Sequence, residues 1–236
     1  GTKKLIVEYV DAVSDALEHI ASDKVKDIAF DEKLDFFHRA SHCFGRTALM
    51  MSGAGSLLYF HLGVIKALWE QGLLPKIMSG SSGGAFIAGI VGTRKPDEMD
   101  KLFESDFLRS EAATELEEIP RRFFLVRQRM DADGVWEAIE RLIPDMTFQE
   151  AYEYSGTHIN ISVAPAGQHQ GSRLLNAITS PNVMVREAVL ASCAVPGVYP
   201  PVTLAARGAN GRRRPYLESR QWVDGSVADD LPVKRL

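Results

Sequence analysis

Apolar residues recur at spacings of three and four along the first 44 residues of the chain, between stretches of polar positions. The first series consists of Leu5, Tyr9, Val13, Leu17 and Ile20. A second series continues this spacing from Ile28 to Phe44. Such a period is typical of amphipathic helices. We therefore predict a helical N-terminal extension over residues 1–45, followed by one main domain over residues 46–236.

Two short apolar runs in the main domain each lead into a glycine-rich turn and then into a helical pattern. The run Ala48–Met51 precedes "SGAGS" and a helical pattern that stops near Gly72. The run "LPKIMSG" precedes "SSGGA" and the wholly apolar "FIAGIVG", which is typical of a buried helix. Repeated strand, turn and helix units imply a parallel sheet with helices on its faces. We therefore expect an α/β fold.

Two more strands and one helix complete the predicted domain. "HINISVAPA" alternates apolar and polar residues as a strand does, and "VMVREAVLASCAVPGVYPPV" predicts a helix that Pro196 ends. Trp222 and Val223 form a short strand that delivers Asp224 into a glycine turn. The charged region between Lys95 and Phe148 has a helical rhythm, and "EAATELEEIPRR" within it is interpreted as a lid or a spacer.

Composition narrows the function classes. A chain of 236 residues with 45% hydrophobic content is long enough to bury a sizeable core. A formal charge of −4 provides no basic field for nucleic acid, and "RRRP" at residues 212–215 is interpreted as a solvated loop. Cys43 and Cys193 lie too far apart in sequence for a disulfide framework or a zinc cluster, so we expect a reducing, cytoplasmic compartment.

The ends of the chain carry no targeting signal that we recognise. No stretch is apolar for about 18 residues, so the sequence predicts a soluble chain without a membrane-spanning helix. Pro232 has the character of a first helical turn only a few residues before the end. We therefore expect a chain that is truncated at its C-terminus.

The turn from Gly80 to Gly84 has the pattern G-x-S-x-G around Ser82. A nucleophile elbow needs this pattern, because the sharp strand-to-helix turn leaves no room for side chains two positions to either side of the serine. Ser81 and Ser79 lack such a pair of glycines and are poorer candidates. The alternative is a glycine-rich turn whose serine merely caps a helix, and these five residues do not decide between the two.

The turn "SGAGS" can supply backbone N–H groups to an oxyanion, as an acyl-transfer site requires. It lies at the carboxyl end of the strand before the elbow. The alternative is a nucleotide-phosphate loop, since Gly53 and Gly55 begin a G-x-G pattern. That pattern fails at the third glycine, where Leu58 stands, and there is no Walker lysine-serine pair.

The general base is less evident than the nucleophile. A conventional triad needs a histidine, but after Ser82 the chain contains only His158 and His169, each in polar surroundings without a motif. Asp224 follows a strand and could take the serine proton directly in a Ser-Asp dyad. Its alternative role is that of a turn aspartate that binds its own backbone.

Taken together, the glycine-rich turn, the G-x-S-x-G and the D-G-S resemble, in this order, the patatin-like phospholipase family. Its members have a glycine-rich oxyanion loop, then G-x-S-x-G, then D-G-[GA]. The stretch Ala191–Val202 is similar to the A-S-x-A-x-P-x-x-F-P-P of that family. "SGAGSLLYFHLGV" is similar to the corresponding segment of the branch that contains fungal and plant lipid-droplet triacylglycerol lipases.

The resemblance implies a patatin-like three-layer α/β/α fold with a mainly parallel central sheet. It also implies that Ser82 is the nucleophile and Asp224 the base, with Gly80 and Gly84 as the glycines of the elbow. The oxyanion loop would then comprise Gly53, Ala54, Gly55 and Ser56. Compared with the common loop, Ala54 replaces a glycine, Leu57 a basic residue and Leu58 the last glycine.

The function implied by the resemblance is hydrolysis of fatty-acyl esters of phospholipids or acylglycerols. We expect no metal and no cofactor, a lipid substrate, peripheral contact with a membrane or lipid surface, and no nucleic acid; the sequence predicts no oligomeric state. One rival hypothesis is a lipid-binding or scaffolding domain of the same fold that has lost catalysis. A weaker rival is a nucleotide-binding module.

Overall fold

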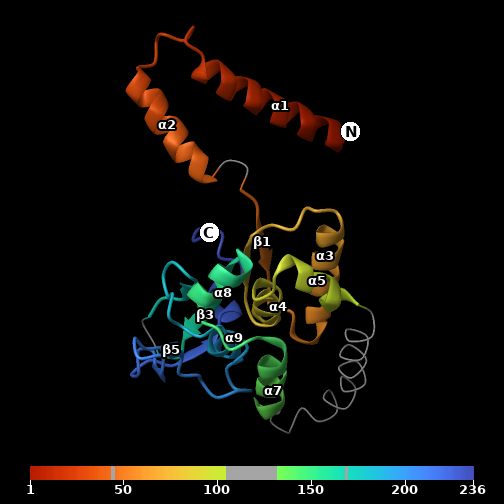
Figure 1. Cartoon of the computed structure of the whole chain (residues 1–236), viewed down its shortest axis with the longest axis vertical. Coiled ribbons are helices and arrows are strands. Elements are labelled where there is room, and N and C mark those ends of the chain that lie inside the picture. The colour runs from red at the N-terminus through yellow and green to blue at the C-terminus, as the bar shows by residue number, and fades with distance from the viewer. Residues whose placement is uncertain (44–45, 105–131, 168–169) are drawn as a thin grey trace. The chain divides into compact units, whose positions relative to one another are not determined.

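The computed structural model describes residues 1–43, 46–104, 132–167 and 170–236, and Figure 1 shows its helices and strands. The chain divides into two units, Gly1–Arg46 and Thr47–Leu236. The segment "EAATELEEIPRR", interpreted above as a lid or a spacer, lies outside the described residues. Within the described parts, none of the helices combines the length and the apolar character that crossing a membrane requires.

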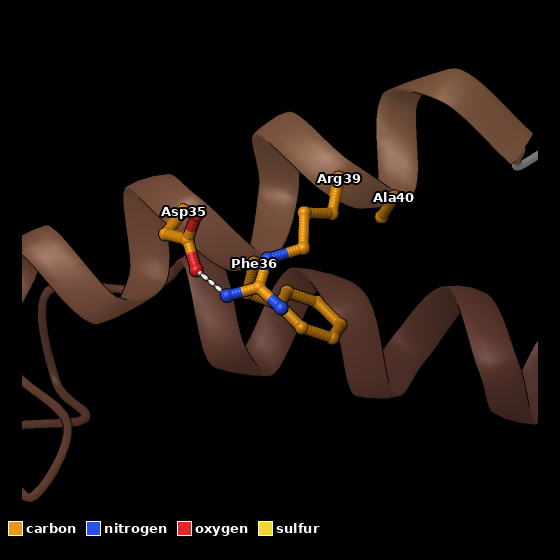
Figure 2. A pocket seen from close by; sticks show the side chains of 4 residues that line it. All are labelled: Asp35, Phe36, Arg39 and Ala40. Atoms are coloured by element: carbon orange, nitrogen blue, oxygen red, sulfur yellow. Dashed lines mark hydrogen bonds and ion pairs between the residues drawn. The ribbon is translucent and has the colours of Figure 1, made fainter.

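The first unit consists of two helices, as its apolar spacing predicts. Helix α1 spans Thr2–Ala21 and helix α2 spans Phe30–Cys43. A hollow on α2 is lined by Asp35, Phe36, Arg39 and Ala40, and Figure 2 shows Arg39 reaching back to Asp35. The guanidinium Nη2 donates to Asp35 Oδ2 one helical turn away. Both side chains are exposed, so the pair is an ordinary surface ion pair of a helix.

The second unit is built around a five-stranded mixed sheet. Its strands are β1 (Ala48–Met51), β2 (Ile77–Gly80), β3 (His158–Pro165), β4 (Arg173–Leu175) and β7 (Trp222–Asp224). Strands β1, β2 and β3 are adjacent and parallel, whereas β4 and β7 both run antiparallel to β3. Strands β1 and β2 end in register at Met51 and Gly80, so the turns that follow them meet at the same end of the sheet, while β3 continues to Pro165.

Strands β2 and β7 pair with the same side of β3, one after the other: β2 pairs with its first half and β7 with its last three residues. Ile161 of β3 pairs with Gly80 of β2 on one side and with β4 on the other. Two residues further on, Val163 pairs again with β4 and, on its other side, with Asp224 of β7. Because β2 ends at Gly80, Asp224 takes a position just beyond the carboxyl end of β2, where the elbow begins.

Helices cover both faces of this sheet (Figure 1). They are α3 (Leu58–Glu70), α4 (Gly83–Gly92), α5 (Pro96–Phe103), α7 (Ala132–Leu142), α8 (Phe148–Ser155), α9 (Val185–Ser192) and α10 (Ser226–Asp229). Six consecutive residues of β3 are buried, which requires cover on both faces because successive side chains point to opposite sides. Every residue of α4 is buried, as its uniformly apolar sequence predicts.

Three features differ from the sequence-based expectation. Strand β4 was not predicted, and residues 213–215 form strand β6 of a hairpin with β5 (Ala205–Arg207) where a loop was expected. Arg213 on this strand donates to Glu187 Oε1 at 2.7 Å, so one arginine of the basic run holds a buried carboxylate. Helix α9 ends at Ser192, four residues before Pro196, and the hydroxyl of Ser192 accepts a hydrogen bond from the N–H of Ser82.

Candidate functional site

Ser82 has a strained backbone between strand β2 and helix α4. Its φ is 51° and its ψ is −122°, and among the described non-glycine residues only Leu217 also has a positive φ. A side chain in such a conformation costs about 1–3 kcal/mol and persists only where the surroundings enforce it. A strained serine between a strand and a helix has the geometry of a nucleophile elbow.

The two glycines that flank Ser82 are required by the close approach of backbone atoms. A Cβ at Gly80 would lie 2.2 Å from the carbonyl oxygen of Gly84. A Cβ at Gly84 would lie 2.3 Å from the carbonyl oxygen of Met51, at the end of β1. Backbone atoms cannot rotate out of the way, so the turn closes only with glycine at both positions, for the reason that the sequence pattern predicts.

The neighbouring Ser81 has a different environment from Ser82. Ser81 is fully buried, and its Oγ donates to the carbonyl oxygen of Asp230 at 3.0 Å. Ser82 is partly exposed. The hydroxyl of Ser81 is therefore engaged in the packing of the turn, and Ser82 is the residue of this pair that a substrate could reach.

Asp224 ends strand β7 and is buried, with 2% of its surface exposed. Its Oδ1 accepts a hydrogen bond from the N–H of Ser226 at 2.9 Å, so the carboxylate does bind its own turn. That bond uses one of the two carboxylate oxygens. The local role weighed in the sequence analysis is thus compatible with a second role for the other oxygen.

Three consecutive residues at the end of α9 bind Ser82 and Asp224. The N–H of Ser82 donates to Ser192 Oγ at 2.9 Å, and the Sγ of Cys193 donates to the carbonyl oxygen of Ser82 at 3.4 Å. The N–H of Asp224 donates to the carbonyl oxygen of Ala194 at 3.0 Å. One short segment therefore holds the elbow and the carboxylate side by side.

The pKa of the Cys193 thiol is affected by the nearby carboxylate of Asp224. Burial, and to a lesser extent the negative charge of Asp224, raise the pKa of this thiol to about 12. A thiol with so high a pKa stays protonated at neutral pH and is a poor nucleophile. Cys193 is therefore a packing residue between Ser82 and Asp224.

The glycine-rich loop, residues 52–56, lies against the elbow. A Cβ at Gly53 would lie 3.4 Å from Ser82 Cβ and 3.2 Å from Ser226 Cβ, so the loop also touches the turn after Asp224. Gly55, with a φ of 50°, begins the 3-10 helix Gly55–Leu57. Leu58 packs toward the core beside Gly83.

The N–H groups of the loop are not equivalent. The N–H of Gly53 donates to Asp230 Oδ1 at 2.8 Å and is occupied by that bond. The N–H groups of Ala54 and Gly55 donate to none of the other residues that the structure describes. Of the loop residues predicted to bind an oxyanion, Ala54 and Gly55 are therefore the ones whose donors are available.

Of the two histidines that a conventional triad could use, the structure describes only His158, which the sheet does not bring to the elbow. His158 begins β3 opposite Ile77, at the end of the sheet away from the elbow, and its ring stacks on Tyr152 at 4.2 Å between centroids. His169 lies outside the described residues. Over the described ranges, His, Cys, Asp and Glu form no group of three or more that could hold a metal ion.

Three site residues were not identified from the sequence: Ser192, Asp230 and His61. Each binds a backbone atom of the elbow or of the loop, and the partner is as many as 177 positions away in the sequence. Ser192 and His61 both fall within segments quoted above for their resemblance to a family. That resemblance was the available signal, but it assigned them no role.

Comparison with known proteins gives matches over most of the chain. The family model described as "Patatin-like phospholipase" matches residues 49–236. A patatin-like phospholipase domain-containing protein of Pyricularia oryzae is 39% identical over 100% of this chain and 30% of its own length. A triacylglycerol lipase of Arabidopsis thaliana is 37% identical over 99% of this chain and 31% of its own length.

The chain spans about a third of the length of the curated relatives it matches. A solved structure, that of VipD from Legionella pneumophila, aligns with 79% of this chain and 47% of its own chain. The sequence identity of that alignment is 15%, and its TM-score is 0.45.

Proposed function

Since the chain belongs to the patatin-like phospholipase family, we propose that it hydrolyses fatty-acyl esters of lipids through a dyad of Ser82 and Asp224. The observation that carries this proposal is the strained backbone of Ser82 in a turn closed by two obligatory glycines. The hydrogen bonds of Ser192 and Ala194, which hold Ser82 and Asp224 to the same short segment, support the pairing.

The reaction proceeds in two halves on these groups. Ser82 Oγ attacks the ester carbonyl while the free carboxylate oxygen of Asp224 takes the hydroxyl proton. The N–H groups of Ala54 and Gly55 bind the oxyanion of the tetrahedral intermediate, which collapses as Asp224 returns the proton to the departing alcohol. Water, deprotonated by Asp224, then attacks the acyl-enzyme, and the fatty acid leaves as Ser82 regains its proton.

The strain at Ser82 fits this chemistry. A serine fixed at a tight turn is already oriented when the substrate binds. Ordering the nucleophile therefore adds less to the activation free energy. Backbone N–H donors in a fixed loop act in the same way on the developing charge, and one such donor is typically worth roughly 10²–10³ in rate.

We propose a neutral acylglycerol as the favoured lipid. One relative, 37% identical across nearly the whole chain, is named a triacylglycerol lipase. Leu57 stands where the family commonly has a basic residue, which leaves the loop without a cation for a phosphate. Leu57 and Phe60, beside the loop, are 71% and 78% exposed and can enter the surface of a lipid aggregate.

This surface contact would place the protein at the surface of a membrane or lipid droplet. We propose that it binds this surface from the cytoplasmic side. Flotation with triolein emulsions tests it. Leu57→Ser/Phe60→Ser should reduce binding to the emulsion and leave turnover of a soluble short-chain nitrophenyl ester unchanged. Equal flotation of the variant and the wild type would contradict the contact.

A lipid panel tests the function. The full-length protein is incubated in EGTA with tri-, di- and monoacylglycerol, phospholipid and lysophospholipid, and released fatty acid is measured. We expect calcium-independent release, fastest from acylglycerols, that is lost in Ser82→Ala and largely kept in Ser81→Ala. Preference for phospholipid would overturn the proposed substrate, whereas lipid binding without turnover would support the non-catalytic rival.

A further inference from the structure

The peptide unit that joins Ser52 to Gly53 is bound at both of its polar atoms. Its carbonyl oxygen lies 3.0 Å from Nε2 of His61. Its N–H donates to Oδ1 of Asp230 at 2.8 Å. Because a carbonyl oxygen only accepts, Nε2 of His61 must carry the proton of the first bond.

The two residues that bind this peptide come from separate parts of the fold. His61 lies on α3, directly after the loop. Asp230 follows α10 near the end of the described chain, 177 positions after Gly53. The backbone carbonyl of Asp230 also accepts the hydrogen bond from Ser81 Oγ. Asp230 therefore connects the glycine-rich loop, through its side chain, to the elbow, through its main chain.

A fixed peptide plane determines where the next N–H groups point. The peptide unit is planar, so the loop after it can move only through the φ and ψ angles of the following residues. Gly53 and Gly55 are the residues that would give such a loop the widest choice of conformations. Two hydrogen bonds on the first peptide remove part of this freedom before a substrate binds.

We propose that His61 and Asp230 are positioning residues that together orient the Ser52–Gly53 peptide, so that the N–H groups of Ala54 and Gly55 face the reacting carbonyl. The inference rests on the proposed function, because it assigns a role within the same site. Neither side chain touches the substrate.

The first experiment replaces Asp230 in the full-length protein. Asp230→Ala should lower kcat by about ten- to a hundredfold with little change in KM, because a displaced donor weakens binding of the transition state more than that of the substrate. Asp230→Asn keeps an acceptor at the same position and should restore most of the rate. Asp229→Ala, which removes only an ion pair with Arg235, is the matched control and should retain the wild-type rate.

The second experiment tests whether His61 acts on the same peptide. His61→Leu should lower kcat in the same way, whereas His61→Gln places an amide donor near Nε2 and should restore part of it. In the double variant His61→Leu/Asp230→Ala the losses should not multiply, because both bonds serve one peptide. Multiplying losses would mean independent roles and would overturn the joint proposal.

A transition-state analogue separates positioning from a general loss of structure. A trifluoromethyl ketone forms an oxyanion on Ser82, so its Ki should rise in the variants by the same factor by which kcat/KM falls. Binding of a non-hydrolysable ether lipid should stay the same. If the ether lipid and the ketone weaken equally, or if Asp230→Asn is as slow as Asp230→Ala, the two residues do not position the loop.

The same variants separate failure of the positioning role of His61 and Asp230 from failure of the proposed lipid hydrolysis. Labelling of Ser82 by a fluorophosphonate needs the oxyanion donors but no lipid substrate. If the wild type labels without hydrolysing any lipid of the panel, the proposed function fails, while slower labelling of Asp230→Ala still supports the positioning role. Unchanged labelling rates in Asp230→Ala and His61→Leu would overturn that role whatever the substrate.

Discussion

Ser192 Oγ accepts a hydrogen bond from the N–H of Ser82 at 2.9 Å and donates its own proton to the carbonyl oxygen of Ser162 at 2.7 Å. The strained turn is thereby tied through one hydroxyl to strand β3 at the centre of the sheet. This bond is part of what holds Ser82 at a positive φ.

Ser192→Ala removes both bonds and leaves the N–H of Ser82 without its partner. We expect a loss of about 1–3 kcal/mol in the free energy of unfolding, the typical cost of an unsatisfied buried polar group. Urea denaturation measures it. The elbow should also relax, so kcat for a soluble ester should fall while KM changes little. An unchanged unfolding midpoint together with an unchanged kcat would show that the bond is dispensable.

Asp224→Asn keeps the size of the side chain and can still accept the N–H of Ser226, but it is a poor acceptor for the hydroxyl proton of Ser82. The rate should fall by roughly 10²- to 10⁴-fold, as is typical when general-base assistance is lost. Steady-state hydrolysis of a nitrophenyl ester provides the measurement.

His158→Ala is the matched comparison, because His158 stacks on Tyr152 at the opposite end of the sheet. Its rate per folded molecule should remain close to that of the wild type. A near-normal rate in Asp224→Asn combined with a collapse in His158→Ala or His169→Ala would replace the dyad by a conventional triad.

Gly84→Ala should unfold the protein or prevent its folding, because the added Cβ would meet a backbone oxygen at 2.3 Å. Gly63→Ala is the control, since this exposed glycine of α3 has open space around its added Cβ. There the alanine should stabilise the helix by roughly 0.5–1 kcal/mol. Melting temperatures of the two variants should therefore shift in opposite directions, and a tolerated Gly84→Ala would disprove the tight contact with β1.

Cys193 should react slowly with thiol reagents in the folded protein. Its pKa is raised from 9.0 to about 12, so at pH 8 the thiolate fraction is roughly a thousandfold smaller than in the unfolded chain. Labelling by iodoacetamide in a Cys43→Ser background, with and without urea, measures the difference. Equal labelling rates in the two conditions would contradict the burial of this thiol.

The same pKa shift predicts how stability responds to pH. The neutral thiol is favoured in the fold, so its contribution is complete below pH 9 and is lost as the pH rises toward 12. Cys193→Ala should remove this part of the alkaline loss of stability. A wild type and a variant that lose stability in parallel between pH 9 and 12 would show that another group titrates there.

The sequence predicted the parts of the site that depend on neighbours in the chain. Ser82 was predicted as the nucleophile because the glycines that its turn requires lie two positions to either side. Asp224 was predicted as the base because it lies between a short strand and a glycine, in the order that the family resemblance implies. The parallel strands and the buried helix α4 were predicted for the same reason, since their apolar patterns are continuous along the chain.

The remaining parts depend on contacts that no local pattern encodes. The side chains of three site residues, Ser192, His61 and Asp230, bind backbone N–H or C=O groups. Every residue type offers these groups, so the identity of the residue at the other end of the bond gives no signal in the sequence. Strand β4, like β7, has three residues, too few for a period to appear, and, unlike β7, it is not directly followed by a glycine turn. Arg213 was assigned to a loop because its partner, Glu187, lies on a helix distant in sequence.

Strand β7 pairs with β3 beyond the point where β2 ends, and it brings Asp224 next to the elbow. The proposed site is therefore complete only after β7 has been synthesised. About 140 residues lie between Ser82 and Asp224, and a ribosome adding roughly 5–20 residues per second needs roughly 7–30 s to make them. If Ser82 and Asp224 form the proposed dyad, the nascent polypeptide has during that interval the nucleophile without its proton acceptor. On the proposed function, a newly made chain therefore cannot hydrolyse lipid until β7 has emerged and paired with β3.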